Sequence, residues 1–147
     1  MELSRRGDYA VRAMLDVATR PADRMTVTKE IALRQDIPPI FLTKIVSSLS
    51  QAGLLRTYRG VAGGVALGKP ADQISLLQII EAVEGPIYIN RCLIRRGECD
   101  RDRACPAHEL WVQAQGELLG LLANKSLADL ARRAQELQQA PMADFAA

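Results

Sequence analysis

The chain has 147 residues and a mass of 16.1 kDa, with 48% apolar and 24% charged residues, which is typical of a globular rather than a disordered protein. No apolar run approaches the roughly 20 residues that cross a bilayer, and residues 1–8 lack the apolar core of a secretory signal, so we expect a cytoplasmic protein with no membrane partner. Residues 1–70 carry 11 Lys and Arg and 6 Asp and Glu, whereas residues 71–147 carry 8 and 11. The basic first half fits a polyanionic partner, although a solvated surface explains it equally well.

Three helices are predicted in the first third of the chain. Apolar residues recur every three or four positions over residues 3–19, with Ser4 as N-cap. A short helix follows at 27–34, for which we expect Thr26 as N-cap and Val27 and Ile31 as the buried edge. The third helix is expected at 39–52. Its predicted core-facing side consists of Phe41, Ile45 and Leu49, flanked by Leu42 and Val46.

Two short strands are predicted at 54–58 and 65–67, joined by a glycine-rich tip at 59–64. Three helices followed by a hairpin is the order of a winged helix-turn-helix. Another helix is expected at 76–84, and residues 86–106 show no regular periodicity. Helical patterns return at about 107–122 and, more weakly, at 127–137. The predicted class is therefore mainly α with a small β-hairpin.

The third helix and the hairpin carry side chains suited to DNA. A helix fits the major groove and reads base edges with its outer face, which here is expected to present Ile40, Thr43, Lys44 and Ser47. Without the hairpin, an ordinary polar helix face explains these four residues equally well. Glycines at the hairpin tip let the backbone approach a surface closely. Arg59 and Gly60 are then candidates for a narrow minor groove and Arg56 for phosphates.

All three cysteines, Cys92, Cys99 and Cys105, fall in the irregular stretch, followed by the only histidine, His108. An odd cysteine count in a cytosolic chain is weak support for disulfides. The cysteine spacings are too wide for the CxxC knuckles of structural zinc and suit a loop around a bulkier inorganic body. Thiolates hold iron–sulfur clusters, in which imidazole replaces a thiolate on one iron in some proteins. Thiol redox sensing and zinc binding stay open as alternatives.

Together these features resemble a known family. The stretches at 3–18, 59–64 (RGVAGG), 79–85 and 108–111 (HELW), with the three cysteines, are similar to bacterial winged-helix iron–sulfur transcription regulators of the IscR, NsrR and RirA type, with IscR nearest. The resemblance covers residues 1 to about 135. It implies a homodimeric repressor or dual regulator that binds double-stranded operator DNA and senses iron–sulfur status, redox state or nitric oxide. The chain lacks an enzyme's cofactor fingerprint, so we expect no catalysis and no small-molecule substrate.

The resemblance also implies an organisation and a ligand set. A winged-helix domain is expected at 1–85, a cluster-binding loop at 86–106, a dimerisation helix region at 107–139 and a flexible tail at 140–147. Cys92, Cys99 and Cys105 match the family's cluster ligands. The fourth ligand is a histidine matching His108 in members with a 2Fe–2S cluster, or an aspartate matching Asp8 of the other subunit in members with 4Fe–4S. Both residues are present, and the sequence around His108 favours 2Fe–2S.

Overall fold

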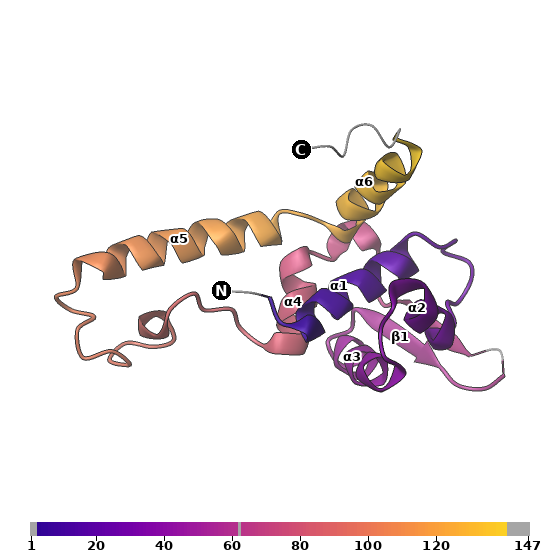
Figure 1. The fold of residues 1–147 in the computed structure, drawn as a ribbon, viewed down its shortest axis with the longest axis horizontal. Helices are drawn as coiled ribbons and strands as arrows, with labels where there is room; N and C mark the ends of the chain where they lie inside the picture. The colour runs from indigo at the N-terminus through magenta and orange to yellow at the C-terminus, as the bar shows by residue number, and fades with distance from the viewer. Residues whose placement is uncertain (1–2, 62, 141–147) are drawn as a thin grey trace.

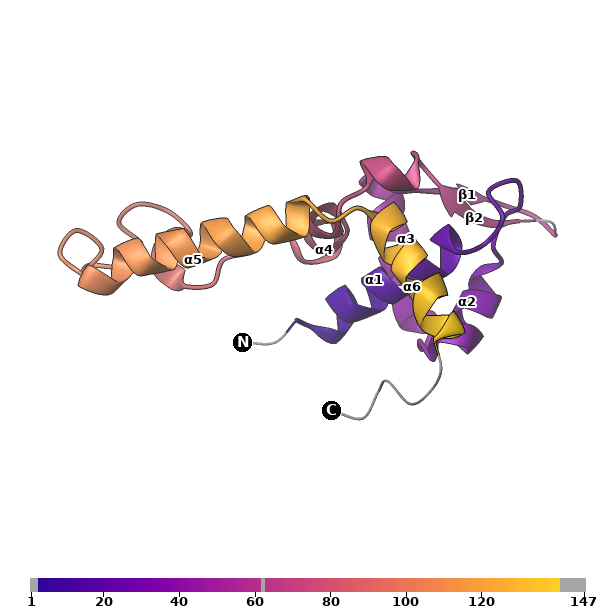
Figure 2. The ribbon, with the colours of Figure 1, turned by 90° about the horizontal axis from the view of Figure 1, so that it is seen from above.

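The computed structural model of the chain describes residues 3–61 and 63–140, so most of the expected tail lies outside the described residues. The chain forms a globular body, and residues 86–123 extend from it as an elongated arm, as Figures 1 and 2 show. The body begins with helices α1 (Arg5–Ala18), α2 (Thr28–Gln35) and α3 (Pro39–Gln51), followed by the antiparallel strands β1 (Leu55–Tyr58) and β2 (Gly64–Leu67). This order confirms the predicted winged helix-turn-helix.

Helix α1 is the centre of the body and packs against α2, α3, α4 (Leu76–Glu84) and α6 (Leu127–Gln139). Its residues Ala10, Ala13 and Met14 are at most 1% exposed. The predicted cap is present, because the Gly7 amide donates to the Ser4 side-chain oxygen at 3.2 Å. Aliphatic side chains supply the core around it, as the low aromatic content predicts.

The second helix is confirmed to within one residue at each end, but its predicted cap is wrong. Helix α2 begins at Thr28 after Val27, and Thr26 does not cap it. The backbone of Thr26 instead pairs with Val65 of β2, through two hydrogen bonds of 2.8 Å, and this short bridge buries Thr26. Because the chain is extended here, Val27 points to solvent with 43% exposure, and only Ile31 of the predicted buried edge is in the core.

The core-facing side of α3 is also shifted from the prediction. Leu42, Ile45, Val46 and Leu49 are buried, but Phe41 is 53% exposed. The ring of Phe41 lies against the edge of Tyr9 on α1, with the centroids 6.3 Å apart, so it covers the rim of the α1–α3 contact rather than its interior.

The second half of the chain leaves the body and returns to it. After α4, residues 86–105 run out along helix α5 (Pro106–Ala123) with only a short 3-10 helix at Arg91–Leu93, and Figures 1 and 2 both show this segment beside α5. Helix α6 then packs back on the body, where Leu127 is fully buried and its amide donates to Ile74 O at 2.7 Å. The expected dimerisation region therefore consists of two helices: α5, which belongs to the arm, and α6, which packs on the body. None of the helices in the described ranges is both long and apolar enough to cross a membrane.

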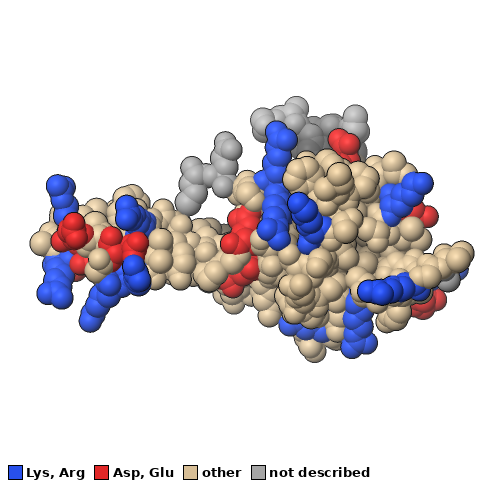
Figure 3. Space-filling model, turned by 90° about the horizontal axis from the view of Figure 1, so that it is seen from below, with Lys and Arg blue, Asp and Glu red and all other residues tan. Residues whose placement is uncertain are grey.

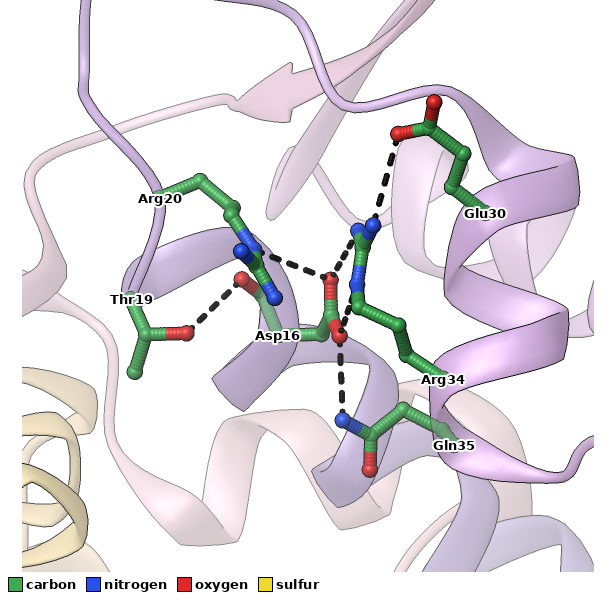
Figure 4. A network of polar contacts seen from close by, with 6 residues as sticks. All are labelled: Asp16, Thr19, Arg20, Glu30, Arg34 and Gln35. Carbon is green, nitrogen blue, oxygen red and sulfur yellow. Dashed lines mark hydrogen bonds and ion pairs between the residues drawn. The ribbon is translucent and has the colours of Figure 1, made fainter. Parts of the chain in front are cut away.

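A buried carboxylate ties α1 to the helix-turn-helix (Figure 4). Asp16 is 2% exposed and accepts hydrogen bonds from Arg34 at 2.7 and 3.0 Å and from Gln35 at 3.0 Å. Arg20 lies 3.8 Å away. Burial raises the pKa of Asp16, but the hydrogen bonds from Arg34 and Gln35 and the charges of Arg34 and Arg20 outweigh it and hold the pKa below the usual 3.8.

We predict that Asp16→Asn lowers the free energy of unfolding at pH 7 by about 1–3 kcal/mol, because it weakens charge-assisted hydrogen bonds inside the body. Since the folded-state pKa is lowered, the carboxylate stabilises the fold above about pH 4 and loses this effect as the pH falls further. Urea unfolding of the two proteins should therefore differ at pH 7 and converge at low pH. Asp8→Asn is the matched control, since Asp8 is 57% exposed, and an equal loss in both variants contradicts the prediction.

Candidate DNA interface and cysteine pocket

The outer face of α3 presents the predicted groove-reading residues together. Ile40 is 74% exposed, and Thr43, Lys44 and Ser47 are exposed on the same helix. The Thr43 hydroxyl donates to Pro39 O at 3.0 Å, which fixes the side chain while leaving its oxygen free to accept. Lys44 has no ion pair among the described residues. A face with one apolar and three polar side chains is suited to a duplex groove.

The hairpin of β1 and β2, which we call the wing, carries the predicted residues at its exposed tip. Arg59 and Gly60 follow β1 directly and both are exposed, and Val61 extends fully into solvent. Gly60 has φ 106°, a backbone conformation that side chains other than glycine rarely adopt, so the turn depends on this residue. Arg56 lies farther back on β1, opposite Ala66. The wing therefore offers a cation at its tip and another at its base.

The structure adds a cation that sequence reasoning missed. Arg6 of α1 donates to the Ser48 hydroxyl of α3 at 2.8 Å, so it lies beside the exposed face of α3. The Arg5-Arg6 pair was visible in the sequence, but only the packing of α1 on α3 brings it to this surface. Figure 3 shows basic side chains spread over the body, while acidic and basic side chains alternate at the end of the arm.

The predicted cluster ligands line one pocket at the far end of the arm. Cys92, Cys99, Cys105 and His108 all border a cavity of about 430 Å³, together with Trp111 and nearby polar residues. The three cysteines are free thiols and half-buried. His108 Nδ1 is buried and has no hydrogen-bond partner among the described residues. A buried imidazole nitrogen without a partner is costly in an isolated protein, and ligation is one way to satisfy it.

Local structure explains why the ligands gather there. Cys105 is the N-cap residue of α5, and Pro106 at the first helical position leads the chain into the helix, which puts His108 in its first turn. The amide of Ile89 donates to the Gln115 side chain at 2.9 Å, so the outgoing segment is fastened to α5. Asp102 accepts from the Gly97 amide at 2.8 Å and closes the loop between the cysteines.

The donor set is compatible with an iron–sulfur cluster. Within the described ranges, no three His, Cys, Asp or Glu side chains converge closely enough to hold one metal ion. The three thiols and the imidazole surround a cavity instead, and these are the side chains that ligate iron–sulfur clusters. The positive end of the α5 dipole adjoins Cys105 and favours negative charge beside it.

Asp8, the alternative fourth ligand, lies away from the cysteine pocket of the same chain. Asp8 is in the first turn of α1, and its carboxylate contacts Arg12 at 3.0 Å. Asp8 does not line the cysteine pocket of the same chain, whereas His108 does.

The root of the arm is fastened to the start of α1 by Glu84, which sequence reasoning did not select. Its carboxylate accepts from the Gly7 amide at 3.1 Å and from the Ser4 hydroxyl. A Cβ on Gly7 would lie 2.6 Å from the Glu84 carboxylate, so a glycine permits this close approach. Since α4 ends at Glu84, this contact joins the root of the arm to the start of α1. A contact across 77 residues leaves no local signal in the sequence.

Comparisons with known proteins agree on one family. The family model described as Rrf2, iron-dependent transcriptional regulator, matches residues 3–133. The IscR transcriptional regulator of Cronobacter sakazakii is 36% identical over 93% of this chain and 84% of its own. Among solved structures, CymR of B. subtilis, titled a global cysteine regulator, matches with a TM-score of 0.75 and 30% identity over 90% of this chain and 98% of its own. IscR of T. potens matches with a TM-score of 0.78 and 26% identity over 99% and 96%.

We predict that Arg59→Ala weakens binding to a duplex from the protein's own upstream region by about 1–3 kcal/mol, because an arginine at the wing tip is lost from the groove. Fluorescence anisotropy at one fixed salt concentration measures the change. Lys125→Ala is the control, since Lys125 is a cation in the α5–α6 connection, outside the proposed interface. Equal affinities of the two variants would mean that the wing stays outside the groove.

Proposed function

This chain belongs to the Rrf2 family of transcriptional regulators, and from that premise we propose that it is a homodimer whose operator affinity depends on an iron–sulfur cluster. The family membership and the likeness to IscR make it a DNA-binding regulator rather than an enzyme. The observation that carries the cluster proposal is the single pocket bordered by all three thiols and the unpartnered imidazole. We expect it to act in the cytoplasm, as a repressor or a dual regulator.

In this proposal Cys92, Cys99 and Cys105 hold the cluster as thiolates and His108 completes the set through the Nδ1 atom. When bound, an iron–sulfur cluster supplies an anionic centre whose state responds to iron, oxidants or nitric oxide. The charges around the pocket are mixed, because Arg91 lies beside the carboxylates of Glu98, Asp100 and Asp102. The N-terminus of α5 adds a partial positive charge next to Cys105, which favours an anionic centre there.

We favour a 2Fe–2S cluster over 4Fe–4S. His108 borders the pocket with a buried free nitrogen, whereas Asp8 is exposed and already paired with Arg12. A 4Fe–4S cluster ligated by Asp8 of a second subunit remains the alternative, and it requires that carboxylate to leave Arg12.

Operator binding is assigned to α3 and the wing. Ile40, Thr43, Lys44 and Ser47 read the major groove, while Arg59 and Gly60 enter the minor groove and Arg56 contacts the backbone. In a two-fold dimer, two such helices meet half-sites about 34 Å apart, one turn of DNA.

The dimer interface is assigned to α5, because the rest of the chain leaves this helix largely exposed. None of its eighteen described residues is buried. Leu110 is 58% and Leu121 60% exposed, and eleven positions make just over three helical turns, so both lie on one stripe. An apolar stripe along an exposed helix is typical of a helix that packs against a partner.

A second function uses the same thiols without a cluster. The three cysteines are unpaired and partly accessible, which favours oxidation as a signal. Protein purified without oxygen distinguishes the two functions: the cluster proposal predicts a coloured protein that contains iron and sulfide and whose three cysteines resist alkylation. A colourless protein, still colourless after reconstitution with iron and sulfide, would leave thiol redox chemistry or zinc binding.

We predict that His108→Ala changes the visible absorption spectrum of the anaerobically purified protein more than Asp8→Ala does, because only the first substitution removes a ligand from the pocket. Both spectra are compared with the native protein at equal iron content per chain. The reverse ranking would transfer the fourth ligand to Asp8 and favour the 4Fe–4S cluster.

We predict that Leu121→Lys weakens dimerisation by at least about tenfold, because it replaces roughly 1.5–3 kcal/mol of apolar burial with a charge. Sedimentation equilibrium measures the dissociation constant of the dimer. Leu33→Lys on α2 is the matched control, since Leu33 is 75% exposed and lies outside the proposed interface. Equal dissociation constants for both variants would exclude α5 as the dimer contact.

A further inference from the structure

A second pocket, of about 430 Å³, lies at the base of the wing and is unusually basic. It is enclosed by the last turn of α1, the loop that follows it, β1, β2 and the residues after β2. Four cations line it, and no carboxylate lines it in the described part of the chain. These cations are Arg20, Arg24, Arg56 and Lys69.

Ordinary structural roles account for only one of these four cations. Arg20 lies 3.8 Å from Asp16 and close to the C-terminal end of α1, where the helix dipole favours positive charge. Arg24, Arg56 and Lys69 have no ion pair among residues 3–61 and 63–140. Lys69 is moreover half-buried, so less water shields its charge. Three like charges around one hollow create a positive local potential that attracts an anion.

The walls of this pocket are suited to a tetrahedral oxyanion. Arginine presents a planar fork of donors to phosphate oxygens, and lysine adds a compact point charge. Pro21 and Pro70 border the hollow, and their restricted φ angles limit the backbone conformations beside it. Arg20 and Arg24 are exposed, and an anion therefore has direct access from solvent.

We propose that this cationic pocket binds one phosphate group, separately from the groove contacts of α3 and the wing tip. The bound phosphate would join the wing, through Arg56, to the α1–α2 loop, through Arg24. Arg20 would be a further contact of the phosphate. The Asp16 carboxylate contacts both Arg20 and Arg34, and Arg34 lies at the end of α2. Either a backbone phosphate of the operator or a free phosphate-bearing small molecule supplies this chemistry, and two measurements distinguish them.

The first measurement titrates inorganic phosphate into the DNA-free full-length protein by calorimetry, with ionic strength held constant by chloride. A free-phosphate site predicts saturable binding of one ion per chain. Arg24→Gln and Lys69→Gln should each weaken this binding about five- to tenfold, the effect of losing one charge-assisted hydrogen bond at a partly solvated site. Lys125→Gln, a cation outside the pocket, should bind like the native protein. Circular dichroism at the working temperature checks that all variants are folded.

The second measurement follows binding to an upstream duplex by anisotropy over a range of salt concentrations. A backbone phosphate in the pocket predicts that Arg24→Gln and Lys69→Gln each reduce the slope of log K against log salt by about one, and that inorganic phosphate competes with the duplex. A free phosphate group predicts unchanged slopes and retained binding of inorganic phosphate by the DNA complex. The proposal is overturned when Arg24→Gln and Lys69→Gln behave like Lys125→Gln in both measurements.

Discussion

Helix α5 buries none of its described residues against its own chain, and the proposed dimer and cluster site both depend on this constraint. A helix with Leu110 and Leu121 in water is marginal alone, because most helical stability comes from packing an apolar face. The cysteine pocket is built on the first turn of this helix, with Cys105 as its N-cap. In the proposed dimer, the subunit that covers α5 would therefore also stabilise the helix that carries Cys105 and His108, which would couple the ligand site to assembly.

The distance between the arm and the DNA-facing residues requires an indirect connection. The cysteines belong to the segment that runs along α5 and to the start of α5, whereas α3 and the hairpin lie on the body (Figure 1). Glu84 at the arm's root binds the start of α1, and the other end of α1 carries Asp16, which binds Arg34 and Gln35 before the turn into α3. One rigid helix thus contacts both the arm and the helix-turn-helix. A ligand at the tip needs only to favour one of two packings to change operator affinity.

Sequence reasoning succeeded where the signal was local. Ser4 caps α1 where it was predicted, and the predicted glycine-rich tip of the hairpin turns at Gly60. The three cysteines and His108, selected from the sequence, border a common pocket, and their role as ligands stays a proposal. It failed at Thr26, whose capping propensity lost to backbone pairing with Val65, a residue 39 positions away. Phe41 was misplaced because periodicity alone does not indicate which neighbours cover a helix face.

The features that periodicity and motifs could not supply are long-range in the chain. The contact of Glu84 with Gly7 and the Asp16–Arg34 ion pair depend on how helices pack, and each residue alone resembles an ordinary surface charge. The same holds for Arg24, Arg56 and Lys69, which three separate segments bring to one hollow. The resemblance to a known family supplied the ligand roles, while the structure supplied the unpartnered Nδ1 of His108 that supports one of them.

The most direct test of this account is the affinity of one operator duplex for the same protein before and after its iron and sulfide are removed under anaerobic conditions. A coupling free energy of about 1–3 kcal/mol between the cysteine pocket and the DNA interface predicts that the two affinities differ roughly 5- to 150-fold at fixed salt. Equal affinities of the loaded and stripped protein, with the fold intact, would contradict control of DNA binding from the cysteine pocket.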